Sequence, residues 1–137
     1  MNTHYPAIKP YKTHCLAVDE PHLLYIEEVG NPTGIPVIIL HDGPGAGSDS
    51  TLRRFFDPHV FRMILFDQRG CGRSTPHANI SNNSTQKLLA DIDAIREFLN
   101  LERVVRFGRA SGALLALLYA QLVPQNVRSL LLYPLFL

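Results

Sequence analysis

Four short and almost uninterrupted apolar runs most constrain what this chain of 137 residues can fold into. They occupy residues 37–40, 63–66, 104–107 and 130–133. A continuous apolar run, unlike an alternating one, is typical of a strand that is buried on both faces. We therefore expect these runs to be central parallel strands of an α/β sheet. Residues 23–29 alternate only partly and are interpreted as an outer hairpin strand.

Helical segments separate these runs. Four apolar residues recur at intervals of four, three and four, which places them on one helical face: Leu88, Ile92, Ile95 and Leu99. The polar residues of this segment fall largely on other faces: Lys87, Asp91, Glu97 and Asn100. This helix is expected to begin near residue 84, where capping side chains precede it. A second helix over 113–122 is apolar nearly all round and is expected to be buried before Pro124 ends it.

Strands that alternate with helices predict one α/β domain over residues 1–137, with a mostly parallel sheet covered on both faces. Ligand sites in such sheets lie beyond the carboxyl ends of the strands. The informative segments are therefore the loops 41–47 and 67–74 and the turn after residue 107.

The turn after residue 107 has the spacing of a nucleophile elbow. Gly108 and Gly112 stand two residues before and two residues after Ala110. A sharp strand-to-helix turn needs small residues at those two positions, so Ala110 is the apex. If Ser111 were the apex, an arginine would occupy a crowded position. We therefore interpret the Ser111 hydroxyl as a hydrogen-bonding group in the first turn of a helix, and a role as substitute nucleophile as the weaker alternative.

The loop 41–47 holds three glycines and a proline, so its main-chain N–H groups can turn inward and help to stabilise an oxyanion. The alternative is a plain tight turn between a strand and a helix. Asp42 would oppose a developing oxyanion unless its side chain points to water.

The loop 67–74 carries charged residues between glycines. We expect Arg69 to form a structural ion pair with Asp67 or with another buried carboxylate. Cys71 lies near Arg73, which could activate a thiol, but no histidine is placed as its base, so we interpret Cys71 as structural.

Composition limits the classes of partner, the compartment and the kinds of site that we expect for this chain. A net charge of +1 gives no reason to expect nucleic acid or an anionic membrane as a partner. Cys15 and Cys71 are lone thiols, which suits a reducing cytoplasm. No apolar segment has the length of a signal peptide core or of a membrane span. The six histidines are scattered, so we expect no metal site.

Several segments together resemble the proline iminopeptidases, a serine peptidase family of the α/β-hydrolase fold. The segments that carry the resemblance are 5–8, 10–13, 53–58, 65–77, 115–117 and 119–121, with Pro124. The resemblance runs along nearly the whole chain and covers about the N-terminal half of such enzymes. It implies a truncated α/β-hydrolase core with about six strands, in which the cap domain and the last strands are absent.

The resemblance also implies an activity and its residues. Members release an N-terminal proline from peptides through an acyl-enzyme, using serine, histidine and aspartate and no cofactor or metal. By position, the nucleophile falls on Ala110, and the oxyanion donors are the backbone N–H groups of Gly43 and Ser111. Members usually show His-Gly-Gly-Pro-Gly and Gly-Gly-Ser-Trp-Gly, so Asp42 and residues 109–111 depart from the pattern. The triad aspartate and histidine of the family come after the position of Leu137.

We therefore predict a proline iminopeptidase-like chain that is catalytically inactive or severely impaired. The alternatives are a non-catalytic remnant that binds a ligand or partner, and a fragment of a split hydrolase. A further alternative is a hydrolase of other substrates that uses Ser111 with a base from another chain. The apolar segment 128–137 is expected to lie at a sheet edge and to favour self-association.

Overall fold

The computed structural model describes residues 5–18, 20–41, 50–69, 71–75, 85–101, 104–109 and 127–133. Along the chain these form β1 (Lys12–Ala17), β2 (Leu23–Gly30), β3 (Ile35–Leu40), the 3-10 helix η1 (Ser50–Arg54), β4 (Phe61–Phe66), α1 (Thr85–Phe98), β5 (Val104–Arg109) and β6 (Val127–Tyr133). The four apolar runs lie within β3, β4, β5 and β6, so the prediction of four strands is confirmed. The helix expected over 113–122 lies outside the described residues.

The described strands form one six-stranded sheet in the order β1-β2-β4-β3-β5-β6. The pairs β1–β2 and β2–β4 are antiparallel. The pairs β3–β4, β3–β5 and β5–β6 are parallel. The sheet is therefore mostly parallel, with one antiparallel hairpin at its beginning, and the predicted α/β class is confirmed.

The expectation that residues 23–29 form an outer strand is wrong. Strand β2 lies between β1 and β4, and β1 is the outer strand. The reason is that β2 buries two adjacent carboxylates, one on each face of the sheet, and such a sequence is typical of a half-exposed strand. Glu27 is 1% exposed and accepts hydrogen bonds from Arg53 Nε and Nη2 at 2.7 and 2.9 Å. Glu28 is 4% exposed and accepts from Arg62 Nε at 2.7 Å.

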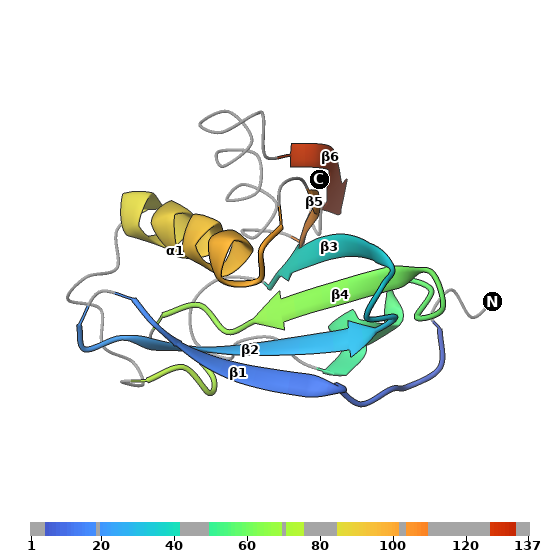
Figure 1. Ribbon diagram of the computed structural model, residues 1–137, viewed down its shortest axis with the longest axis horizontal. Helices are drawn as coiled ribbons and strands as arrows, with labels where there is room; N and C mark the ends of the chain where they lie inside the picture. Colours follow the sequence, from blue (N-terminus) through green and yellow to red (C-terminus); the bar gives the residue numbers. More distant parts are fainter. Residues whose placement is uncertain are drawn as a thin grey trace.

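Helix α1 covers one face of the sheet (Figure 1). Side chains from β2, β3, β4 and α1 form one apolar cluster there: Leu24, Ile26, Ile38, Leu40, Ile64, Phe66, Leu89, Ile92 and Ile95, with Leu101. A second cluster fills the other face: Val29, Val37, Ile39, Met63 and Leu65, with Leu52 and Phe56. Strands β3 and β4 thus contribute alternate residues to two cores, which explains their continuous apolar sequences.

Helix α1 begins at Thr85, next to the expected start, ends at Phe98 and is followed by a left-handed residue. Asn100 has φ of 58°. The Leu101 N–H donates to the Arg96 carbonyl at 3.0 Å, and the Asn100 N–H donates to the Glu97 carbonyl at 3.1 Å. This is the Schellman pattern, which satisfies the last carbonyl groups of a helix. Among the described residues, no helix combines the length and the apolar character needed to cross a bilayer.

Candidate active site

The parallel strands end together at one edge of the sheet. The register pairs Ile39 of β3 with Leu65 of β4 and with Phe107 of β5. Because β3 lies between β4 and β5, the ends of these three strands lie side by side. The three segments that the sequence singled out begin at these strand ends, but residues 42–47 and the turn after Arg109 lie outside the described residues.

The frame of the predicted elbow begins inside β5. Gly108 pairs with Leu40 on one side and with Leu132 on the other, and β5 ends at Arg109. Ala110 therefore follows directly after the last residue of a central strand. Ala110, Ser111 and Gly112 lie outside the described residues, as does Gly43 of the glycine loop, and their proposed roles stay predictions.

His41 ties the end of β3 to the segment after β4. The Gln68 backbone N–H donates to His41 Nε2 at 2.9 Å, and the Gln68 side-chain amide donates to the His41 carbonyl at 3.2 Å. Both residues are buried. The Nε2 lone pair of His41 is thus engaged by the backbone of the segment after β4. No pattern in the sequence indicates this pair, since the two residues are far apart in the chain.

The segment after β4 folds back on its first residue. Asp67 Oδ2 accepts from the backbone N–H of Arg73 at 2.8 Å and from Arg73 Nε at 2.9 Å. The Ser74 hydroxyl donates to the Asp67 carbonyl at 2.5 Å and accepts from the Tyr25 N–H at 2.9 Å. These bonds fix both ends of the segment against β2.

Arg73 is more exposed than the Asp67 carboxylate with which it pairs. Its guanidinium lies 4.0 Å from the centre of the Tyr25 ring, in a cation–π contact. Burial alone would lower the pKa of Arg73, but the hydrogen bond and the charge of Asp67, with the charge of Glu27, outweigh burial and raise it. Arg73 therefore remains a cation beside the candidate site.

Arg69 pairs with Asp91 of α1. Arg69 Nε donates to Asp91 Oδ2 at 2.7 Å, and Nη2 donates to Oδ1 at 2.6 Å. The expectation of a structural ion pair with a buried carboxylate is thereby confirmed. Although Asp91 is a polar residue of α1 set apart from the apolar stripe in the sequence, it is only 2% exposed. A carboxylate can occupy that position because the guanidinium supplies both charge and hydrogen bonds.

Cys71 is 2% exposed, and its thiol donates to the Arg69 carbonyl at 3.8 Å. Its burial favours the structural interpretation. Within the part of the chain that the structure describes, no three His, Cys, Asp or Glu side chains come together in a way that could hold a metal ion. The described part of this edge is thus a scaffold of hydrogen bonds and ion pairs that fixes the starting points of the loops after β3 and β4.

A family model described as alpha/beta hydrolase fold matches residues 35–133. A proline iminopeptidase of Xylella fastidiosa (strain 9a5c) is 50% identical over 137 residues, which is 100% of this chain and 44% of that protein. A proline iminopeptidase of Neisseria gonorrhoeae is 47% identical over 133 residues, which is 97% of this chain and 43% of that protein. The chain thus spans less than half the length of these curated relatives.

Solved structures show the same similarity. A proline iminopeptidase-related protein from Thermus thermophilus superposes with a TM-score of 0.76 at 30% identity, covering 88% of this chain and 43% of that one. The proline iminopeptidase of Mycobacterium smegmatis gives a TM-score of 0.71 at 25% identity, covering 87% of this chain and 42% of that one. The sheet described above is therefore similar to one part of these larger proteins.

Proposed function

Because this chain belongs to the α/β-hydrolase fold family and is similar to proline iminopeptidases, we propose that it is a proline iminopeptidase-like protein whose own acyl-transfer activity is lost or severely impaired. The substrate class, by resemblance, is a peptide with an N-terminal proline. The location is cytoplasmic, because the lone cysteines suit a reducing compartment.

The observation that carries the proposal is the residue that follows β5. Gly108 lies in the sheet at the level where β3 ends, and β5 stops one residue later. The next residue is an alanine, whose methyl group cannot form an acyl-enzyme. Loss of a triad member leaves only about 10³–10⁴-fold acceleration over water, from the oxyanion hole and binding. In this proposal Gly43 and Ser111 still offer their backbone N–H groups to an oxyanion.

The experiment uses release of p-nitroaniline from L-proline p-nitroanilide. The unaltered chain is expected to give no turnover above a blank. Ala110→Ser alone is expected to leave it inactive, since we assign no general base among its residues. Turnover by the unaltered chain that Ser111→Ala abolishes would overturn the proposal and favour the alternative in which Ser111 is the nucleophile.

A chimera distinguishes the effect of the residue at position 110 from the effect of catalytic residues that this chain does not supply. Residues 1–137 are joined to the remaining part of the Xylella fastidiosa relative, with Ala110 or with Ala110→Ser. The second form is expected to exceed the first by at least about 100-fold. Equal activity of the two forms would contradict the assignment of Ala110 to the nucleophile position.

Binding without turnover is the second candidate function. It is favoured by the buried pairs Gln68–His41 and Arg69–Asp91, which keep the site scaffold in place although the nucleophile position has changed. A partner chain, either a second copy or the complementary part of a split hydrolase, would add to β6, which pairs with β5 alone among the described strands. Light scattering over a wide range of concentrations tests self-association, and a constant monomer mass argues against it.

A further inference from the structure

A cavity of about 510 Å³ lies at the end of the sheet opposite to the candidate active site. Its lining comes from the N-terminal segment, the end of β2 and the turn before β4: Tyr5, Pro6, Ala7, Ile8, Gly30, Asp57, Pro58 and His59. Gly30 pairs with Arg62, at the beginning of β4, whereas the candidate active site lies beyond the end of that strand. The length of β4, roughly 17 Å, separates the two places.

The N-terminal wall of the cavity is held by hydrogen bonds to η1. The Tyr5 N–H donates to the Arg54 carbonyl at 2.8 Å, and Arg54 Nε donates to the Tyr5 carbonyl at 2.6 Å. Arg53 Nη1 also donates to the Ile8 carbonyl at 3.3 Å. Ile8 packs against the apolar cluster on this face of the sheet. The wall is therefore anchored at both ends.

The floor of the cavity leaves no room for a larger residue at Gly30. Gly30 has φ of 95°, and a Cβ atom there would lie 2.6 Å from the Phe61 carbonyl oxygen and 3.2 Å from the Pro58 carbonyl oxygen. The neighbouring turn before β4 is closed by Asp57, whose carbonyl accepts from the N–H groups of Val60 and Phe61 at 3.1 and 3.0 Å. A pre-formed shape of this kind reduces the cost of ordering the protein around a ligand.

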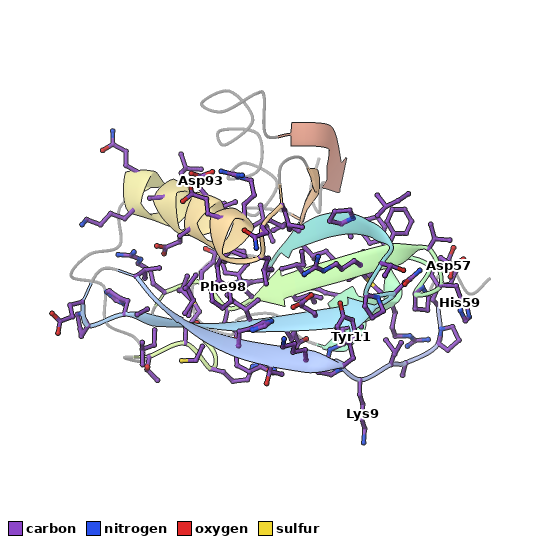
Figure 2. All side chains as sticks on the ribbon, viewed as in Figure 1. Lys9, Tyr11, Asp57, His59, Asp93 and Phe98 are labelled. Carbon is purple, nitrogen blue, oxygen red and sulfur yellow. The ribbon has the colours of Figure 1, made fainter. Side chains whose placement is uncertain are left out.

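Asp57 supplies the one carboxylate among the lining residues. Its Oδ1 accepts the His59 N–H at 2.9 Å, which fixes the side chain and leaves Oδ2 to a ligand. Figure 2 shows Asp57 and His59 together at the end of the sheet, and shows Lys9 pointing away from them. The remaining lining is mostly apolar, so the cavity pairs a negative charge with apolar walls, and its volume lies in the range of small-molecule sites.

From this chemistry we infer that the cavity binds a small protonated amine that carries an apolar group. The ammonium contacts Asp57, and the apolar part packs against Ile8 and Pro58. This site is separate from the candidate active site and does not depend on the activity proposed above.

Phenethylamine is the probe, added to the ¹⁵N-labelled chain while amide spectra are recorded. Saturable shifts are expected at the amides of residues 5, 7, 8, 30, 57 and 59–61, with an affinity on the order of 1 mM for so small a ligand. The neutral isostere 2-phenylethanol and the anion 3-phenylpropionate are expected to bind at least about tenfold more weakly. Equal binding of 2-phenylethanol would overturn the role of the carboxylate, and shifts without saturation would overturn the site.

Two variants complete the test. Asp57→Asn keeps the oxygen that accepts the His59 N–H and removes the charge, and it is expected to weaken phenethylamine binding about tenfold. Asp93→Asn, on α1 (Figure 2), is the matched control and is expected to leave binding unchanged. Ala7→Phe fills the cavity from its exposed wall and is expected to abolish the shifts. Unchanged binding in Asp57→Asn or in Ala7→Phe would contradict the inference.

Discussion

Arg69 and Asp91 form a two-point ion pair that joins the segment after β4 to helix α1. The two N–O distances are 2.7 and 2.6 Å, and the side chains are 1% and 3% exposed. A charge that is buried to this degree depends on its partner, because water cannot replace it. The pair therefore fixes one loop of the candidate site to the helix that covers the sheet.

Removing either partner is expected to destabilise the protein strongly. Arg69→Met leaves an uncompensated carboxylate, and Asp91→Leu leaves an uncompensated guanidinium, each at a cost of about 3–5 kcal/mol in the free energy of unfolding. The double variant Arg69→Met with Asp91→Leu is expected to lose less than the sum, because both charges are gone. Urea unfolding of the four proteins measures this, and additive losses would contradict it.

Glu28 is expected to make stability depend on acid pH. Burial would raise the pKa of Glu28, but hydrogen bonds from His14, Arg62 and Tyr11 outweigh it and hold the pKa below its ordinary value of 4.5. The carboxylate therefore adds stability that is fully present above about pH 4.5. This stability is lost as the pH falls through the lower folded value, because the unfolded chain takes up the proton first.

Urea unfolding between pH 7 and pH 3 checks the effect of Glu28. Glu28→Gln is expected to cost about 1–3 kcal/mol near neutral pH and to lose less on acidification than the unaltered protein. Glu97→Gln is the control, since the Glu97 side chain is 68% exposed. If the free energy of unfolding of Glu28→Gln falls as steeply with decreasing pH as that of the unaltered protein, the assigned role of Glu28 is contradicted.

Tyr11 is expected to make stability depend on alkaline pH. Burial first, and then the hydrogen bond to Glu28 and its charge, raise the pKa of Tyr11 to about 12. The neutral phenol adds stability that is present below pH 10, the ordinary pKa of a tyrosine, and is lost as the pH rises toward 12. Denaturation at pH 9 and at pH 11 should show a smaller loss for Tyr11→Phe than for the unaltered protein. The exposed Tyr5 provides the control variant Tyr5→Phe, and equal losses in all three proteins would count against this role of Tyr11.

Asn100 is expected to tolerate glycine and to resist alanine. Its φ of 58° is a left-handed conformation in which a Cβ atom is unfavourable, and asparagine and glycine adopt it most readily. Asn100→Ala should lower the free energy of unfolding by about 1 kcal/mol, whereas Asn100→Gly should stay within about 0.5 kcal/mol of the unaltered protein. The two variants are compared by thermal unfolding. If the alanine variant is as stable as the glycine variant, the role of Asn100 as a left-handed helix cap is contradicted.

Strands β3 and β4 could be predicted from the sequence because both of their faces are covered. Strands β3 and β4 place alternate residues in two apolar clusters, so their sequences are continuous apolar runs. The inner place of β2 could not be predicted, because Glu27 and Glu28 are typical of surface residues until their arginine partners are known. The same holds for Asp91, whose partner lies in a different loop.

Some features of the candidate site also leave a pattern in the sequence, and others do not. The roles of Gly108 and Ala110 could be proposed from the sequence because an elbow imposes a local spacing of small residues, and they stay predictions. The hydrogen bonds between His41 and Gln68 could not, because they form only when two parallel strands bring their ends together. Local geometry leaves a pattern in the sequence, whereas a contact between distant loops leaves none.

The two neighbouring carboxylates of β2 also have a consequence for how the sheet assembles. Glu27 meets Arg53 on one face and Glu28 meets Arg62 on the other. A slip of one residue in the pairing would turn each carboxylate to the opposite face and leave both without their cations. A hairpin with the wrong register would therefore be disfavoured during folding by its unpaired carboxylates as well as by its misplaced apolar side chains.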